Sequence, residues 1–156
     1  MKSTSIRELI GAHPLLADFG SEDLDLIAGC GRNQVFAAGA ALAREGEAAD
    51  RFFLIRKGRA SLQVHAPGSA LVIDTAGPGE LVGWSWIFPP YRWTNDVEAV
   101  EDTRAVAIEA KCLRDKCERD PAFGYRIMTR FAQVMADQLQ ATSVRLLDLY
   151  GADGAR

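Results

Sequence analysis

Residues 36–62, FAAGAALAREGEAADRFFLIRKGRASL, carry the clearest signal of the fold. Short apolar or alternating runs are separated there by Gly39, Gly46 and Gly58, which is the pattern of short strands joined by tight turns. Similar runs, again separated by glycines, continue to residue 109. Many short strands at this spacing predict a small antiparallel barrel or jelly roll.

Helical patterns lie on both sides of this β-rich region. Asp120-Pro121 marks the start of the last helix, because proline is tolerated in the first turn. We therefore expect an α+β fold, in which an antiparallel β-roll (a double-stranded β-helix or jelly roll) is flanked by N-terminal helices and a long C-terminal dimerisation helix. The expected organisation is one domain at 1–150, with entry helices at 1–32, the roll at 33–109 and C-terminal helices at 110–150, and then a frayed tail at 151–156.

The last helix carries a heptad pattern. Its apolar or small residues recur at alternating steps of four and three positions, which is the spacing of a coiled-coil seam. The first half must pack partly on the roll, whereas the second half runs further than one small roll can cover. The spacing therefore predicts a parallel homodimer, with a seam formed by Met128, Ala132, Met135, Leu139, Thr142, Leu146 and Leu149.

Composition excludes several classes of protein. The 156 residues are 48% hydrophobic and 25% charged, a balance typical of a soluble globular domain with a substantial core. A net charge of −3 argues against a nucleic-acid partner, because phosphate binding needs clustered Lys and Arg. No apolar run approaches the ~20 residues that span a bilayer, and the N-terminus lacks a signal-peptide pattern. We expect a cytoplasmic protein without a membrane partner.

The residues that carry enzyme or metal chemistry are also missing. Cys30, Cys112 and Cys117 are odd in number and lack CxxC spacing, so we interpret them as structural cysteines without a disulfide framework and expect no metal. The sequence contains no GxSxG, HExxH, Walker or GxGxxG motif. We therefore expect no enzyme, no catalytic residue and no cofactor.

Three stretches, taken with the order of helices, roll and long helix, resemble the cyclic-nucleotide-binding domain superfamily, the family of the catabolite activator protein's sensor domain. Residues 13–28, HPLLADFGSEDLDLIA, resemble its entry helices, and residues 36–62 resemble its strand-and-turn pattern. LQATS, residues 139–143, is similar to the part of the long helix that presents hydroxyls to adenine. The resemblance covers about residues 5–149 and implies a bound ligand, cAMP or another cyclic nucleotide.

Residues 77–99 stand in the place of the family's phosphate-binding cassette. There a glycine-rich turn leads into a short helix, whose exposed N–H groups hold the cyclic phosphate. The resemblance implies that Glu80 binds the ribose and Arg92 the phosphate. The full set of ligand-binding residues that it implies is Gly79, Glu80, Leu81, Arg92, Trp93, Thr94, Thr142 and Ser143, of which the last two would meet the base.

The direction of the Arg92 side chain stays open at this point. In the family, the arginine shares strand parity with the inward Val and Ala that follow it, whereas Val97 and Ala99 are odd-numbered here. Without a bulge, Arg92 faces away from the pocket and Trp93 enters it. With a bulge, Arg92 faces the ligand.

Five aromatic residues between Trp84 and Trp93 leave a second question open, because such a loop can stack on a base, plug the pocket or contact another protein. No winged-helix segment follows the long helix, so we expect a stand-alone sensor or regulatory module that binds cAMP or a related nucleotide in the roll and signals through a partner protein. The alternative hypothesis is a degenerate, nucleotide-blind domain, whose Trp84–Trp93 loop is a protein–protein or assembly surface.

Overall fold

The computed structural model describes residues 4–154, which form a β-roll with helices packed against it. The helices are α1 (Ile6–Ala12), α2 (Ser21–Ala28), α3 (Ala110–Arg119) and α4 (Pro121–Gly154). The strands are β1 (Gly31–Phe36), β2 (Ala41–Ala43), β3 (Arg51–Lys57), β4 (Ala60–Ala66), β5 (Ser69–Ala76), β6 (Leu81–Val82), β7 (Asp96–Ala99) and β8 (Thr103–Glu109).

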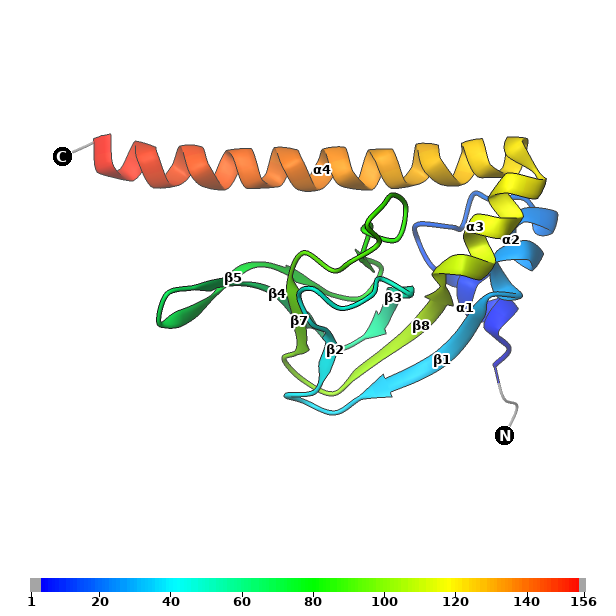
Figure 1. The fold of residues 1–156 in the computed structure, drawn as a ribbon, viewed down its shortest axis with the longest axis horizontal. Coiled ribbons are helices and arrows are strands. Elements are labelled where there is room, and N and C mark those ends of the chain that lie inside the picture. The colour runs from blue at the N-terminus through cyan, green and yellow to red at the C-terminus, as the bar shows by residue number, and fades with distance from the viewer. Residues whose placement is uncertain (1–3, 155–156) are drawn as a thin grey trace.

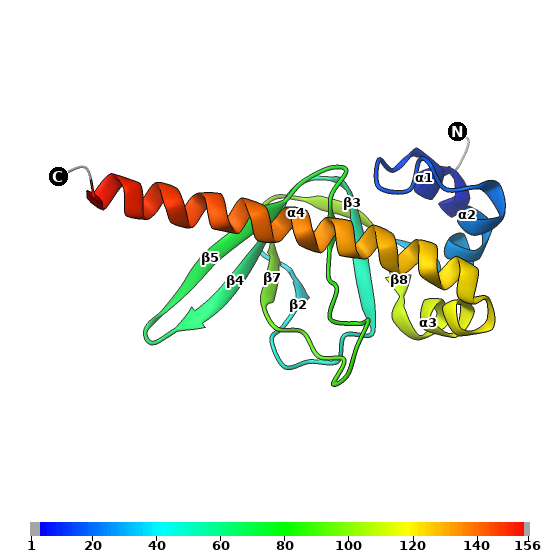
Figure 2. The same ribbon diagram turned by 90° about the horizontal axis from the view of Figure 1, so that it is seen from above.

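Two four-stranded antiparallel sheets make up the roll, in the orders β1-β8-β3-β6 and β2-β7-β4-β5. Figure 1 shows α4 running along the roll, with α1, α2 and α3 gathered near its N-terminal end. Seen from above, α4 crosses the roll towards the β4–β5 hairpin (Figure 2). The predicted fold, an antiparallel roll with entry helices and a long C-terminal helix, is confirmed.

Strand β3 lies between the interior of the roll and the helices, and it is buried on both faces. Phe53 and Ile55 face the interior of the roll, whereas Phe52 and Leu54 line an apolar space beneath α3 and α4. The strand ends at Lys57, and Gly58, which follows it, has a φ of +90°. A side-chain carbon on Gly58 would lie 2.4 Å from a backbone carbonyl oxygen, so only glycine fits this turn.

Helix α4 begins where the sequence predicts and continues further than expected. The Asp120 carboxylate accepts a hydrogen bond from the N–H of Phe123 (3.2 Å) and caps the first turn. The helix runs through Gly151 to Gly154, so the expected tail is wrong for residues 151–154, while residues 155–156 lie outside the described residues. A glycine inside a helix costs only about 1 kcal/mol, which is too little to end it.

The two halves of α4 differ in exposure. In the first half, Ile127 and Phe131 are buried, and Met128 packs against the same core. In the second half, Leu139 is 69% exposed and Leu149 is 66% exposed. The C-terminal part of the predicted seam therefore presents apolar surface to solvent, and the homodimer stays a prediction.

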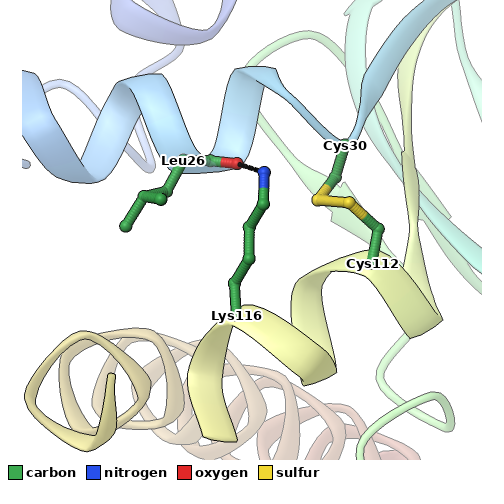
Figure 3. Close-up of a disulfide and its surroundings, with 4 residues drawn as sticks. All are labelled: Leu26, Cys30, Cys112 and Lys116. Carbon is green, nitrogen blue, oxygen red and sulfur yellow. Dashed lines mark hydrogen bonds between the residues drawn. A yellow bond between two sulfur atoms is a disulfide. The ribbon is translucent and has the colours of Figure 1, made fainter. Parts of the chain in front are cut away.

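Cys30 and Cys112 form a disulfide with a Cα–Cα distance of 5.7 Å (Figure 3). The expectation that the cysteines provide no disulfide framework is therefore wrong for this pair. Spacing could not show this pair, because folding brings together two residues that are 82 positions apart. Cys117 is a free, half-buried thiol, and burial raises its pKa to about 11.

Candidate ligand site

The segment between β6 and β7, residues 83–95, is a series of turns and contains no helix. The short cassette helix that the resemblance implies is therefore absent from this segment. Pro89 and Pro90 give the physical reason, because neither has an N–H to donate and each disfavours helical backbone in the residue before it.

The turn at residues 77–80 is held from two sides. The N–H of Gly79 donates to the carbonyl of Ile55 (3.0 Å). A side-chain carbon on Gly79 would lie 3.1 Å from Cγ of Pro14, so the loop after α1 packs directly on the turn. The Glu80 carboxylate accepts a hydrogen bond from the N–H of Gly77 (3.2 Å). Glu80 therefore lies on the expected turn, but its carboxylate already has a partner within that turn.

Trp93, and not Arg92, enters the interior of the roll. The Trp93 side chain is 7% exposed, and its ring stacks on Phe53 with 6.2 Å between ring centroids. Gly83 makes the space, because a side-chain carbon there would lie 2.6 Å from the Trp93 ring. Alternation along the chain turns Arg92 outward, where its guanidinium donates to the carbonyl of Gly46 (2.7 Å). The structure therefore contradicts the inward Arg92 that the resemblance implies.

Burial explains why the tryptophan takes the interior position. Transfer of an indole from water to a position among apolar side chains lowers the free energy of the folded state. Transfer of a guanidinium to the same position raises it, unless an anionic partner is buried with it. The next predicted site residue, Thr94, is exposed, and its hydroxyl donates to Oδ1 of Asn95 (3.1 Å). Arg92 and Thr94 both line a shallow outer cleft, so they lie on the wrong side of the chain to reach a ligand inside the roll.

A cavity of about 540 Å³ lies between the roll and the middle of α4. This volume is within the range of small-molecule sites. Among the predicted site residues, Thr142 lines the cavity, while the Ser143 hydroxyl donates to the carbonyl of Leu139 (2.9 Å). The lining consists of Leu62, Ile73, Asp74, Trp84, Asn95, Met135, Ala136, Gln138, Leu139 and Thr142.

Arg145 is the residue beside this cavity that the sequence analysis missed. Its guanidinium donates to the carbonyl of Ile73 (2.7 Å) and to Oδ1 of Asp74 (2.9 Å), and both acceptors belong to cavity-lining residues. These bonds hold the second half of α4 to β5. The available signal was helical spacing, because Arg145 lies three positions after Thr142 and therefore on a neighbouring part of the same face.

The predicted ligand-binding residues fall into separate groups in this structure. Gly79 and Glu80 lie on the turn under Pro14, and Leu81 faces the apolar space beneath the helices. Arg92 and Thr94 are on the outer cleft, Trp93 is inside the roll, and Thr142 lines the cavity under α4. The structure does not join them into one site.

The aromatic loop is packed more tightly than an open interaction surface. Trp86 is 1% exposed and stacks on Phe52 with 5.0 Å between ring centroids, so it belongs to the core with Trp93. Tyr91 is half-buried, with the Arg114 guanidinium 4.3 Å from its ring. Among the loop's five aromatic side chains, Phe88 is the most exposed, at 44%.

Two titratable groups near these segments have shifted pKa values. Asp96 lies on the outer face of the sheet, and its pKa is below its ordinary value. The main cause is the hydrogen bond from the N–H of Glu45, and His65 and Arg44 add smaller contributions. Burial lowers the pKa of His13, which lies next to Pro14 on the loop that packs against the turn. Within residues 4–154, no group of three or more His, Cys, Asp or Glu is placed to hold a metal ion, and no helix is long and apolar enough to cross a membrane.

An antiparallel roll with a glycine-rich turn between β5 and β6, and a long C-terminal helix beside a cavity of about 540 Å³, is the architecture of the cyclic-nucleotide-binding class of β-roll domains. The chain belongs to the cyclic nucleotide-binding domain family, whose profile matches residues 33–120. The match covers β2 to β8 and α3. It therefore includes both the turn with Glu80 and the segment in which Arg92 points out of the roll.

Similar proteins agree with this assignment. The chain is 28% identical over 119 residues to a CRP-like cAMP-activated global transcriptional regulator of Mycobacterium tuberculosis, a match that covers 76% of this chain and 51% of the regulator. The chain thus spans about half the length of the curated relatives it matches. A cyclic nucleotide-binding domain from Methylobacillus flagellatus has the same fold, with a TM-score of 0.77 and 19% identity over 92% of this chain and 81% of that one. The catabolite activator protein of Thermus thermophilus has a TM-score of 0.67 and 24% identity over 88% and 63% of the two chains.

Proposed function

We propose that this domain is a regulatory sensor module, in which a small molecule binds between the roll and α4, and a partner protein reads the resulting change in α4. The cavity of about 540 Å³ carries this proposal. One wall belongs to the roll and the other to α4. A ligand that fills the cavity therefore binds differently to arrangements in which α4 lies nearer to the roll or further from it, and this difference is the requirement for a switch.

The first candidate ligand is cAMP or a related cyclic nucleotide. Family membership supports it, as does the cAMP-activated relative in Mycobacterium tuberculosis. Within the cavity, the Trp84 ring offers a surface on which a base can stack. The Thr142 hydroxyl donates to the carbonyl of Gln138 (2.9 Å), so it can meet a base edge only as an acceptor. Arg145 lies beside the cavity and could take the place of Arg92, which points away, but a phosphate would have to displace the Asp74 carboxylate that the Arg145 guanidinium already binds.

The second candidate is the nucleotide-blind module, and the position of Trp93 favours it. The indole fills interior space, and the Glu80 carboxylate is engaged with its own turn. In this case the domain acts through protein contacts alone. The exposed apolar residues of α4, including Leu146 and Leu149, supply a surface for a second copy of the chain.

Titration calorimetry with cAMP and cGMP tests the two candidates. The sensor predicts micromolar or tighter binding, about tenfold weaker in Trp84→Ala because base stacking is lost. Arg92→Ala is the matched control and should leave the affinity unchanged, since Arg92 lies outside the roll. An absence of heat up to millimolar nucleotide supports the nucleotide-blind module. A loss of binding in Arg92→Ala would show that nucleotide is bound through the family's arginine and not in the cavity under α4.

A further inference from the structure

The surroundings of the Cys30–Cys112 disulfide point to chemistry that is independent of any ligand under α4. The bond joins the start of β1 to the first turn of α3. Lys116, one turn further along α3, donates from Nζ to the carbonyl of Leu26 at 2.7 Å (Figure 3). The disulfide and this hydrogen bond together fasten α3 to the entry helices, and α3 leads through Asp120 directly into α4.

A charged cleft of about 470 Å³ opens beside this bond, and Cys30 is part of its wall. Four cationic side chains and two carboxylates line it: Arg32, Arg51, Lys111, Arg114, Asp50 and Glu109. Arg51 and Arg114 are engaged, with Gln34 and with the carbonyl of Trp86 respectively. Within residues 4–154, Arg32 and Lys111 make no salt bridge or side-chain hydrogen bond, so both can meet an incoming anion.

We propose that the Cys30–Cys112 disulfide is a reversible exchange site for a small thiol with a net negative charge, such as glutathione, which enters this cleft and thereby controls whether α3 is covalently joined to the entry helices. The excess of positive charge draws in the anionic thiol. Cys30 forms part of the cleft wall and is only 7% exposed, so the thiol reaches Sγ through a local opening of this wall and not through global unfolding.

The exchange runs in two balanced steps. A thiolate of the small molecule attacks Sγ of Cys30, the bond between Cys30 and Cys112 breaks, and Cys112 leaves with the electron pair as a thiolate. Cys112 is in the first turn of α3, where the positive end of the helix favours this charged form. A second small thiol then attacks the outer sulfur of the mixed disulfide. Cys30 leaves as a thiolate, and Cys30 and Cys112 each take one of the two protons that the small thiols lost, so two small thiols become one small disulfide while the protein gains two thiols.

Reduction leaves α3 held by weaker contacts. The buried side chains of Ala110 and Leu113 still pack against the core, and Lys116 still reaches Leu26. The covalent closure of an 82-residue separation is lost. The redox state of this pair therefore changes how firmly the N-terminal end of α4 is anchored.

The test compares reduction by glutathione with reduction by neutral 2-mercaptoethanol, at equal thiolate concentration and low salt. Cys117→Ser serves as the background, so that maleimide labelling followed by mass spectrometry counts only the thiols of the pair. Lys111→Glu should slow reduction by glutathione between about 3-fold and 10-fold and leave the rate with 2-mercaptoethanol unchanged. Lys57→Glu, which makes the same charge change on an exposed residue outside the cleft, is the matched control and should change neither rate.

Three outcomes overturn the proposal. One is a rate with glutathione that Lys111→Glu and Lys57→Glu change equally. Another is reduction that occurs only at the rate of global unfolding in urea, which makes the bond an inert structural one. The third concerns α3: hydrogen exchange of its amides should become faster on reduction, and unchanged exchange refutes the control of α3.

Discussion

Replacing Trp93 with alanine tests the central feature of the site, which is the side chain that occupies the interior of the roll. Trp93 is 7% exposed and lies against Phe53 and Gly83. Its removal deletes a large buried ring and leaves a cavity that the strands around it can fill only in part. Trp→Ala substitutions at buried positions cost about 3–5 kcal/mol. Because Trp93 is not completely buried, we expect about 4 kcal/mol for Trp93→Ala.

Thermal unfolding followed by circular dichroism measures this cost. For a domain of this size, each kcal/mol lowers Tm by roughly 2–4 °C, so Trp93→Ala should lower Tm by about 10 °C. Arg92→Ala is the matched control. It removes one exposed hydrogen bond to the carbonyl of Gly46, worth at most about 1 kcal/mol. Its Tm should fall by less than about 4 °C.

Which of the two variants loses more Tm decides which side chain lies inside the roll. If Arg92 occupied the interior and Trp93 the surface, Arg92→Ala would be the more damaging change. A Tm for Trp93→Ala within about 2 °C of the wild-type value would refute the inward tryptophan, since roughly 1 kcal/mol or less would then be lost. The family's arginine contact would again become a reasonable expectation.

Three further predictions concern other parts of the chain. Reduction of Cys30–Cys112 without unfolding removes the closure of an 82-residue separation, which is worth about 4 kcal/mol, so Tm should fall by about 10 °C; an unchanged Tm contradicts this. The pKa of Asp96 is lowered in the folded protein, so its contribution to stability is present above about pH 4 and is lost as the pH falls further; Tm of Asp96→Asn should therefore depend less on pH below 4 than that of the wild type. Leu139→Asp should give monomers in light scattering at micromolar concentration, because it places a charge in the predicted seam, and a persisting dimer would remove Leu139 from that seam.

Local rules account for the parts of the structure that the sequence predicts. The glycine spacing of residues 36–62 is a local property of tight turns, and it predicts the roll. The alternation of side chains between Arg92 and Val97 is equally local, and it allows for an inward Trp93 before any three-dimensional information is used. Asp120-Pro121 predicts the start of α4 for the same reason.

The features that the sequence analysis missed depend on contacts between distant segments. The Cys30–Cys112 pair and the bond from Arg145 to Asp74 each join residues more than 70 positions apart, and no spacing rule reports such pairs. The prediction of a short helix in the cassette was wrong for a different reason. A resemblance transfers the helix of relatives onto a segment in which Pro89 and Pro90 oppose it.

The two buried faces of β3 have a consequence for folding fidelity. In most strands, a slip of one residue is costly because it moves polar side chains into the core. In β3 the same slip exchanges Phe52 and Leu54 for Phe53 and Ile55, so the apolar run itself offers little discrimination between the two pairings. Discrimination between the two pairings then depends on the end of the strand, where the carbonyl of Asp102 leaves room only for a glycine, so a slipped strand would place a residue with a side chain there. Substitutions of Gly58 should therefore lower the yield of correctly paired protein as well as the stability of the folded state.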